Sequence, residues 1–133
     1  MLEGSCLCGS IRYQAEGPLS LAARCHCVQC RKASGAEFAT NANVPAASFR
    51  LVAGAELLGS FCVTPGRARC FCTRCGSPLF KKSDDQRDVV RIRLGSLDTE
   101  ADVQPVAHAF VSEKPRWSHI HDDLPQFAGL PER

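Results

Sequence analysis

Residues 25–32 read CHCVQCRK, and they place three thiols, Cys25, Cys27 and Cys30, in a C-x-C-x-x-C spacing. Packing of a hydrophobic core does not require thiols so close together, whereas binding of a metal ion does. Three sulfur ligands leave the fourth position of a tetrahedral zinc ion open. We therefore expect a zinc ion at this segment that the protein does not fully enclose.

The cysteine content of the whole chain favours metal binding over disulfides. Nine of the 133 residues are cysteine, and an odd number cannot be paired completely within one chain. Residues 1–5 lack the basic and apolar pattern of a secretory signal, so we expect a cytoplasmic, reducing environment. Seven of the nine cysteines fall into three tight clusters, as metal sites require and disulfides do not.

The other two clusters are thiol pairs that each end in glycine. Cys6 and Cys8 precede Gly9, and Cys72 and Cys75 precede another glycine. Glycine permits the positive φ angle that turns backbone N–H groups back toward sulfur. We expect the two pairs to form one closed, structural zinc site with four ligands, which leaves the triple at residues 25–30 as the open, catalytic site.

Two cysteines, Cys62 and Cys70, belong to none of these clusters. They flank a turn predicted at Thr64-Pro65-Gly66 and could approach each other across a hairpin. We favour a role for both as small apolar side chains, since free cysteine is among the most buried residue types. The alternative is that one of them completes a second four-thiolate site, which would make both zinc ions structural.

The four histidines are weaker candidates for metal ligands. His26 lies between two expected ligands, and on a C-x-C turn its side chain should point away from the metal, where it could still form hydrogen bonds near the site. His108 falls in an expected strand and is best explained as a partly buried core residue. His119 and His121 alternate around an isoleucine, and we expect them at the surface or in a lid.

Short segments of alternating or apolar residues, separated by glycine and proline turns, predict a mostly β protein with several short antiparallel strands. We expect little helix beyond one turn near residues 31–35, which glycine ends. The chain is expected to form one domain over residues 1–133, with an irregular tail from about residue 113. The expected strands cover residues 11–15, 36–44, 48–52, 56–63, 68–72, 78–82, 89–94 and 106–111.

Charge and hydropathy exclude some functions. No run of about 18 apolar residues is present, so we expect no membrane span. The net charge of +2 is small and the basic residues are spread along the chain, so we do not expect nucleic-acid binding. Arg31 and Lys32, with Arg24, surround the central thiols and are candidates to bind the carboxylates of a small anionic thiol. The alternative is that they are solvated surface charges.

Zinc held by three thiolates would suit thiol chemistry. Such an ion lowers the pKa of an incoming thiol, so that it binds as thiolate, and polarises an aldehyde oxygen as a Lewis acid. Three thiolates donate charge strongly and make the ion a poor generator of hydroxide. The sequence therefore favours a small-molecule thiol and an aldehyde as substrates over a hydrolytic reaction.

Three motifs together resemble the glutathione-dependent formaldehyde-activating enzyme family, which includes the centromere protein V group. They are GSCLCG at residues 4–9, CHCVQCRKASG at residues 25–35 and FCTRCGS at residues 71–77. The resemblance implies a zinc-binding β-tent fold and a carbon–sulfur lyase or synthase that reversibly joins glutathione, as co-substrate, to formaldehyde. It also implies two zinc ions, a structural one at Cys6, Cys8, Cys72 and Cys75 and a second at Cys25, Cys27 and Cys30.

Two other classes of function stay open at this point. A non-catalytic binding module would use the same zinc-stabilised scaffold and would not need an open metal position. A thiol redox or metal-storage protein would release zinc reversibly on oxidation. The sequence does not determine the physiological thiol and aldehyde, the general acid or base, or the oligomeric state.

Overall fold

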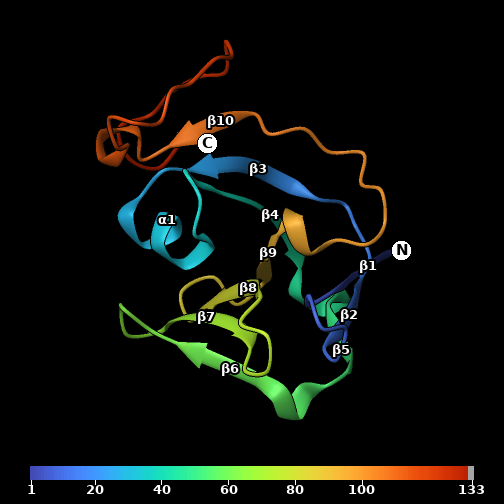
Figure 1. Cartoon of the computed structure of the whole chain (residues 1–133). Coiled ribbons are helices and arrows are strands. Elements are labelled where there is room, and N and C mark those ends of the chain that lie inside the picture. Colours follow the sequence, from blue (N-terminus) through green and yellow to red (C-terminus); the bar gives the residue numbers. More distant parts are fainter. Residues whose placement is uncertain (132–133) are drawn as a thin grey trace. The chain divides into compact units, whose positions relative to one another are not determined.

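The computed structural model describes residues 1–131 (Figure 1). Contacts between residues divide the chain into two compact units, and each unit combines segments that are distant in the sequence. The first unit contains Met1–Ser20 and Ala42–Asp102. The second contains Leu21–Asn41 and the chain from Val103 onward. The expectation of one domain over residues 1–133 stays a prediction.

The first unit holds a small three-stranded antiparallel sheet. Strand β2 (Arg12–Ala15) lies in the middle, between β1 (Leu2–Ser5) and β5 (Arg50–Ala53). Inward residues of β2 alternate with exposed ones, so Tyr13 and Ala15 are buried while Arg12 is exposed. This period of two is what a strand with one buried face requires.

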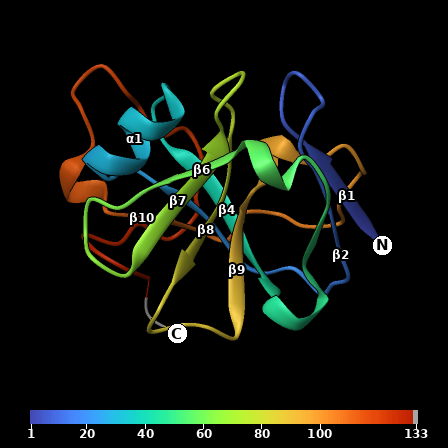
Figure 2. The same ribbon diagram turned by 90° about the horizontal axis from the view of Figure 1, so that it is seen from below.

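The same unit contains an antiparallel series of four consecutive strands: β6 (Leu58–Phe61), β7 (Arg67–Cys72), β8 (Pro78–Ser83) and β9 (Val89–Arg93). Figure 2 shows β6, β7 and β8 side by side. A register shift between Cys70 and Phe71 marks a bulge in β7 just before the thiol at the end of the strand. This bulge re-aims the end of β7, where the second thiol pair begins.

A hydrophobic core supports these strands. Ile11, Leu79 and Ile92 are completely inaccessible to solvent. The ring of Phe49 packs against both Tyr13 and Phe80, with centroid distances of 5.2 and 4.8 Å. Aromatic pairs at such distances contribute beyond their buried area. The first unit therefore places its thiol pairs on a rigid frame.

The second unit is built around the central thiol segment. Strand β3 (Ser20–Cys25) leads into helix α1 (Val28–Ser34) and pairs in parallel with β10 (Ala107–Ala109). Gly35 ends the helix in the left-handed conformation, with φ of 63°, and its N–H bonds the carbonyl of Arg31. Strand β4 (Ala39–Pro45) then carries the chain from the second unit into the first.

The prediction of a mostly β protein with little helix is confirmed. Among the described residues, α1 is the one α-helix, and short 3-10 turns occupy Ala46–Ser48, Ala55–Leu57, Leu94–Ser96 and Val111–Glu113. No helix in the described part of the chain has the length and apolar character needed to cross a membrane. The helix begins earlier than predicted, at Val28, because the Cys27 side chain caps its first turn.

The sequence patterns missed or misplaced some strands. Strand β1 was not predicted, because its residues include glycine and serine and show no clear alternation. The strand expected over residues 106–111 was too long: β10 covers three residues and ends where Phe110 adopts a positive φ of 54°. After Glu113 the described chain holds no named strand, although a bridge joins Gln126 to His108.

Candidate metal centres

The two thiol pairs of the first unit meet in one cluster. Cys6 and Cys8 follow β1, Cys72 ends β7, and Cys75 lies in the next turn. All four Sγ atoms lie within 4.8 Å of one another. The Sγ of Cys8 is 3.6 Å from that of Cys6 and 3.9 Å from that of Cys72. The cluster therefore presents four donors around a single point, as predicted from the spacing.

Backbone turns aim these thiols inward. Gly9 and Gly76 adopt positive φ angles of 77° and 80°, the conformation predicted from their place after each pair. The backbone N–H of Ile11 points at the Sγ of Cys6 across 3.2 Å, and that of Arg74 points at the Sγ of Cys72 across 3.4 Å. Such N–H groups stabilise sulfur in its anionic form.

The two pairs are also tied directly to each other. The N–H of Leu7 donates to Ser77 Oγ over 2.8 Å, and the Arg74 guanidinium donates to Ser10 Oγ over 3.1 Å. The hydrogen bonds with Ser77 lower the pKa of the Cys75 thiol to about 5. Hydrogen bonds with Ser10 also lower the pKa of Cys8. At neutral pH this cluster therefore already carries thiolate, the form that binds metal.

The second cluster contains the three thiols of the second unit. Cys25 ends β3, Cys27 caps α1, and Cys30 lies in its first turn. Their three Sγ atoms lie within 4.8 Å of one another, with Cys25 and Cys30 buried and Cys27 half-buried. The N–H of Cys30 donates to the Sγ of Cys27 at 3.3 Å, so the helix cap and the cluster share one sulfur.

The two clusters differ in their donor sets. Within residues 1–131, the group around Cys25 contains three His, Cys, Asp or Glu donors, whereas the group around Cys6 contains four. Hydrogen bonding with Cys27 and Cys30, together with burial, raises the pKa of the Cys25 thiol. A divalent cation reverses this preference because it favours the thiolate. The chemistry of both donor sets therefore fits a thiophilic metal ion.

The structure also places the four histidines and Cys70, which were not expected to be metal ligands. The His26 ring is completely buried and belongs to neither cluster, in agreement with the expectation that it points away from the metal. His108 is also buried, and His119 and His121 are exposed. Cys70 is 7% exposed and packs in the core of the first unit, as predicted.

The prediction of a buried, apolar role was wrong for Cys62. This residue is exposed, because it follows the last residue of β6 in the loop that joins β6 to β7. In the described part of the chain neither Cys62 nor Cys70 joins a group of metal donors. The alternative in which one of them completes a second four-thiolate site therefore finds no support.

Arg31 and Lys32 extend from α1 beside the second cluster. The Arg31 guanidinium donates to the carbonyl oxygen of Glu113 at 3.2 Å, and Lys32 is exposed. The Glu113 carboxylate accepts from the N–H of Val28 at 3.1 Å, which fixes the start of the helix to the tail. Their binding to a ligand stays a prediction.

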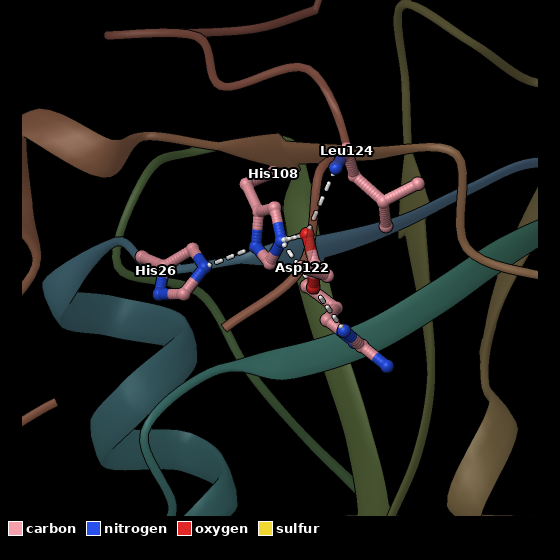
Figure 3. Close-up of polar contacts among 5 residues, drawn as sticks. His26, His108, Asp122 and Leu124 are labelled. Carbon is pink, nitrogen blue, oxygen red and sulfur yellow. Dashed lines mark hydrogen bonds and ion pairs between the residues drawn. The ribbon is translucent and has the colours of Figure 1, made fainter. Parts of the chain in front are cut away.

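Sequence reasoning missed one group of residues in the second unit. His26 Nε2 lies 2.8 Å from His108 Nδ1, and His108 Nε2 lies 2.9 and 3.0 Å from the two carboxylate oxygens of Asp122 (Figure 3). Arg24 donates to the same carboxylate over 2.9 Å. Asp122 belongs to a tail without a recognisable pattern, so no spacing could connect it with the thiols.

The sequence model of the family described as glutathione-dependent formaldehyde-activating enzyme matches residues 1–113, which include both thiol clusters. The chain belongs to this family. A relative of the glutathione-dependent formaldehyde-activating type from Halomonas elongata, which is named for that activity, is 32% identical over 143 residues. The alignment covers 99% of this chain and 90% of the relative.

A solved structure shares the fold of this chain. The crystal structure of a Rhodobacter sphaeroides protein superposes with a TM-score of 0.64 at 23% identity. The match covers 75% of this chain and 91% of the other. At this identity the likeness concerns the fold alone.

Proposed function

We propose that the protein is a zinc-dependent carbon–sulfur lyase or synthase. In this proposal it reversibly joins glutathione, or a similar thiol, to formaldehyde or another small aldehyde. The observation that carries the proposal is the cluster of three thiols, Cys25, Cys27 and Cys30, which offers one donor fewer than the other cluster. Membership of a family described as formaldehyde-activating enzymes supports the choice of substrates.

Zinc suits the geometry of the thiols. A tetrahedral ion with zinc–sulfur bonds of about 2.3 Å sets its sulfurs about 3.8 Å apart. The two Sγ–Sγ distances given above for the four-cysteine cluster, 3.6 and 3.9 Å, agree with this value. Soft thiolate donors favour zinc over hard cations such as magnesium. We propose one structural zinc ion at this cluster and one catalytic zinc ion at the three-cysteine cluster.

In the second unit, the thiols would hold the catalytic metal ion and the basic side chains of α1 would bind the thiol substrate. A zinc ion bound by three thiolates supplies acidification of an incoming thiol and polarisation of an aldehyde oxygen. Arg31, whose guanidinium is steadied by the Glu113 carbonyl, keeps further N–H donors for a carboxylate of the thiol substrate. Exposed Lys32 adds a second positive charge on the same helix. The reducing cytoplasm would supply glutathione.

The experiment follows exchange between glutathione, formaldehyde and their adduct by NMR, with the zinc-loaded protein at catalytic concentration. We expect exchange above the spontaneous rate, and we expect Cys27→Ser to abolish this excess. A protein that holds two zinc ions but gives only the spontaneous rate would remove this substrate assignment. A second zinc ion with four protein ligands would instead favour a zinc-stabilised binding module.

A further inference from the structure

A line of hydrogen-bonded side chains connects the tail of the second unit to the segment that carries the three thiols. It runs from Asp122 through His108 to His26 (Figure 3), with the spacings of 2.8–3.0 Å given above. Both imidazoles are at least 98% buried, since His26 is 0% and His108 is 2% exposed. Paired, buried hydrogen bonds of this kind hold each ring in one orientation.

The direction of the hydrogen bonds follows from Asp122. Hydrogen bonding with His108 lowers the pKa of the Asp122 carboxyl, and the N–H of Leu124 donates to it as well, so this group accepts. His108 must then donate from Nε2. In a neutral imidazole the other nitrogen accepts, so His108 Nδ1 accepts a proton from His26 Nε2–H.

This order leaves Nδ1 of His26 as an unprotonated nitrogen. That atom is buried and has no hydrogen-bond partner among the described residues. If His108 Nδ1 instead donated to His26 Nε2, the proton of His26 would sit on Nδ1 as a buried N–H. Buried N–H groups without partners are rare in folded proteins. The Asp122 carboxylate thus selects the tautomer of His26 without contacting it, because His108 bonds both residues.

His26 stands between two sulfur donors, so its position fixes theirs. Its backbone N–H donates to the carbonyl of Ala109 at 2.9 Å, and Cys25 lies opposite Ala109 in the pairing of β3 with β10. On its other face the ring packs against Phe38, with a centroid distance of 5.2 Å. The turn from Cys25 to Cys27 is therefore held by its backbone and by the side chain at its centre.

We propose that Asp122 is a positioning residue for the three-cysteine cluster, acting through His108 and His26 to hold Cys25 and Cys27 in the geometry that binds metal. The inference rests on the proposed function in assuming that this cluster holds a metal ion. Asp122 lies beyond residues 1–113, the part that the family model matches. The tail thereby contributes to the metal centre without supplying a ligand.

The ion pair with Arg24 is a separate effect. Both side chains are about one-third exposed, at 33% and 31%, and exposed ion pairs contribute little to stability. Arg24→Gln removes this pair and leaves the bonds between His108 and Asp122 in place. It should therefore change the affinity for metal much less than Asp122→Asn does.

The test measures Zn²⁺ affinity by competition with a chromophoric chelator, using the full chain. The wild-type protein should bind two ions, and Asp122→Asn should bind one of them about tenfold more weakly, in line with other residues that orient metal sites. Asp123→Asn is the matched control, since it removes the same charge from an exposed neighbour. Co²⁺ in place of Zn²⁺ should show a changed sulfur-to-cobalt absorption for one ion in Asp122→Asn.

The outcomes separate this inference from the proposed function. If the wild-type chain binds two ions and Asp122→Asn holds both with unchanged affinity, the positioning role is wrong while the proposed function stands. If the wild-type chain binds only one ion, the proposed function fails first. A second measurement needs no variant: long-range ¹H–¹⁵N spectra of the wild-type protein should show His26 protonated at Nε2, and protonation at Nδ1 would overturn the inference.

Discussion

At the scale of single residues, the buried Tyr13 should make the stability of the first unit depend on pH at alkaline values. It is the only tyrosine of the chain, it is 1% exposed, and its hydroxyl lies 2.6 Å from Ser96 Oγ. Burial raises the pKa of Tyr13 above the ordinary value of about 10. The Tyr13 hydroxyl therefore ionises at a lower pH in the unfolded chain than in the folded protein. The contribution of Tyr13 to folding stability is complete below a pH of about 10. It is lost as the pH rises through the pKa of Tyr13 in the folded protein.

Ultraviolet titration of the phenolate tests this prediction on a single residue. The folded protein should form phenolate only above the pH at which the chain in denaturant does so. Tyr13→Phe should remove the signal and flatten the alkaline loss of stability, although the lost hydrogen bond costs about 1 kcal/mol. Equal titration of the folded and unfolded chains would show that Tyr13 is not buried as described.

Gly54 is a position where a side chain is not tolerated. Its φ angle is 77°, and an added Cβ would overlap the carbonyl oxygen of Ser10. Gly54→Ala should lower the free energy of unfolding by about 2–4 kcal/mol, through the strained backbone and the overlap. Gly95→Ala is the control, because an added Cβ there meets no atom within 4 Å.

Chemical denaturation of the two variants measures the difference. We expect the midpoint of Gly54→Ala to fall clearly below that of the wild type, and that of Gly95→Ala to change by less than about 1 kcal/mol in free energy. Equal midpoints for the two variants would mean that the contact between the Gly54 turn and Ser10 is looser than described.

At the scale of elements, each cluster depends on a different kind of support. Cys27 caps α1, and serine is also a good N-cap, so Cys27→Ser removes a metal ligand while it preserves the helix start. Cys72 ends a central strand, is 0% exposed and joins turns that are 64 residues apart in the chain. We expect Cys27→Ser to lose one zinc ion and stay folded, whereas Cys72→Ser unfolds the chain.

Metal analysis together with circular dichroism decides between these outcomes. The metal content should fall from two ions to one in Cys27→Ser, with an unchanged β-sheet spectrum. If both variants unfold to the same extent, the division into an open catalytic cluster and a closed structural one is wrong.

The strands and clusters were predictable to different degrees. The thiols were found because their ligand spacing is local, β7 because it follows a strong turn signal, and β9 because its apolar residues are rich in valine and isoleucine. The line from Asp122 to His26 was not predictable, because it joins residues separated by 82 and 14 positions. Only the parallel pairing of β3 with β10 brings His108 beside the thiol segment, and no local pattern encodes that pairing.

For the whole molecule, removal of metal should occur in two stages. Three donors hold an ion less firmly than four, so a chelator should first remove the ion of the cluster around Cys25. The proposed ion of the four-cysteine cluster would tie together the thiol pairs that follow β1 and β7, and its removal should be accompanied by loss of β structure. Parallel records of zinc release and circular dichroism test this, and simultaneous loss of both ions with unfolding would contradict it.

The two clusters also differ in when they can form during translation. All three thiols of the α1 segment emerge from the ribosome within six residues, so a nascent chain could bind the proposed catalytic ion early. The centre that needs Cys75 must wait until more than half of the polypeptide has been made. Until then Cys6 and Cys8 lack the other two thiols of their cluster. If this cluster holds the proposed structural zinc, a shortage of zinc in the cell would delay folding at that step.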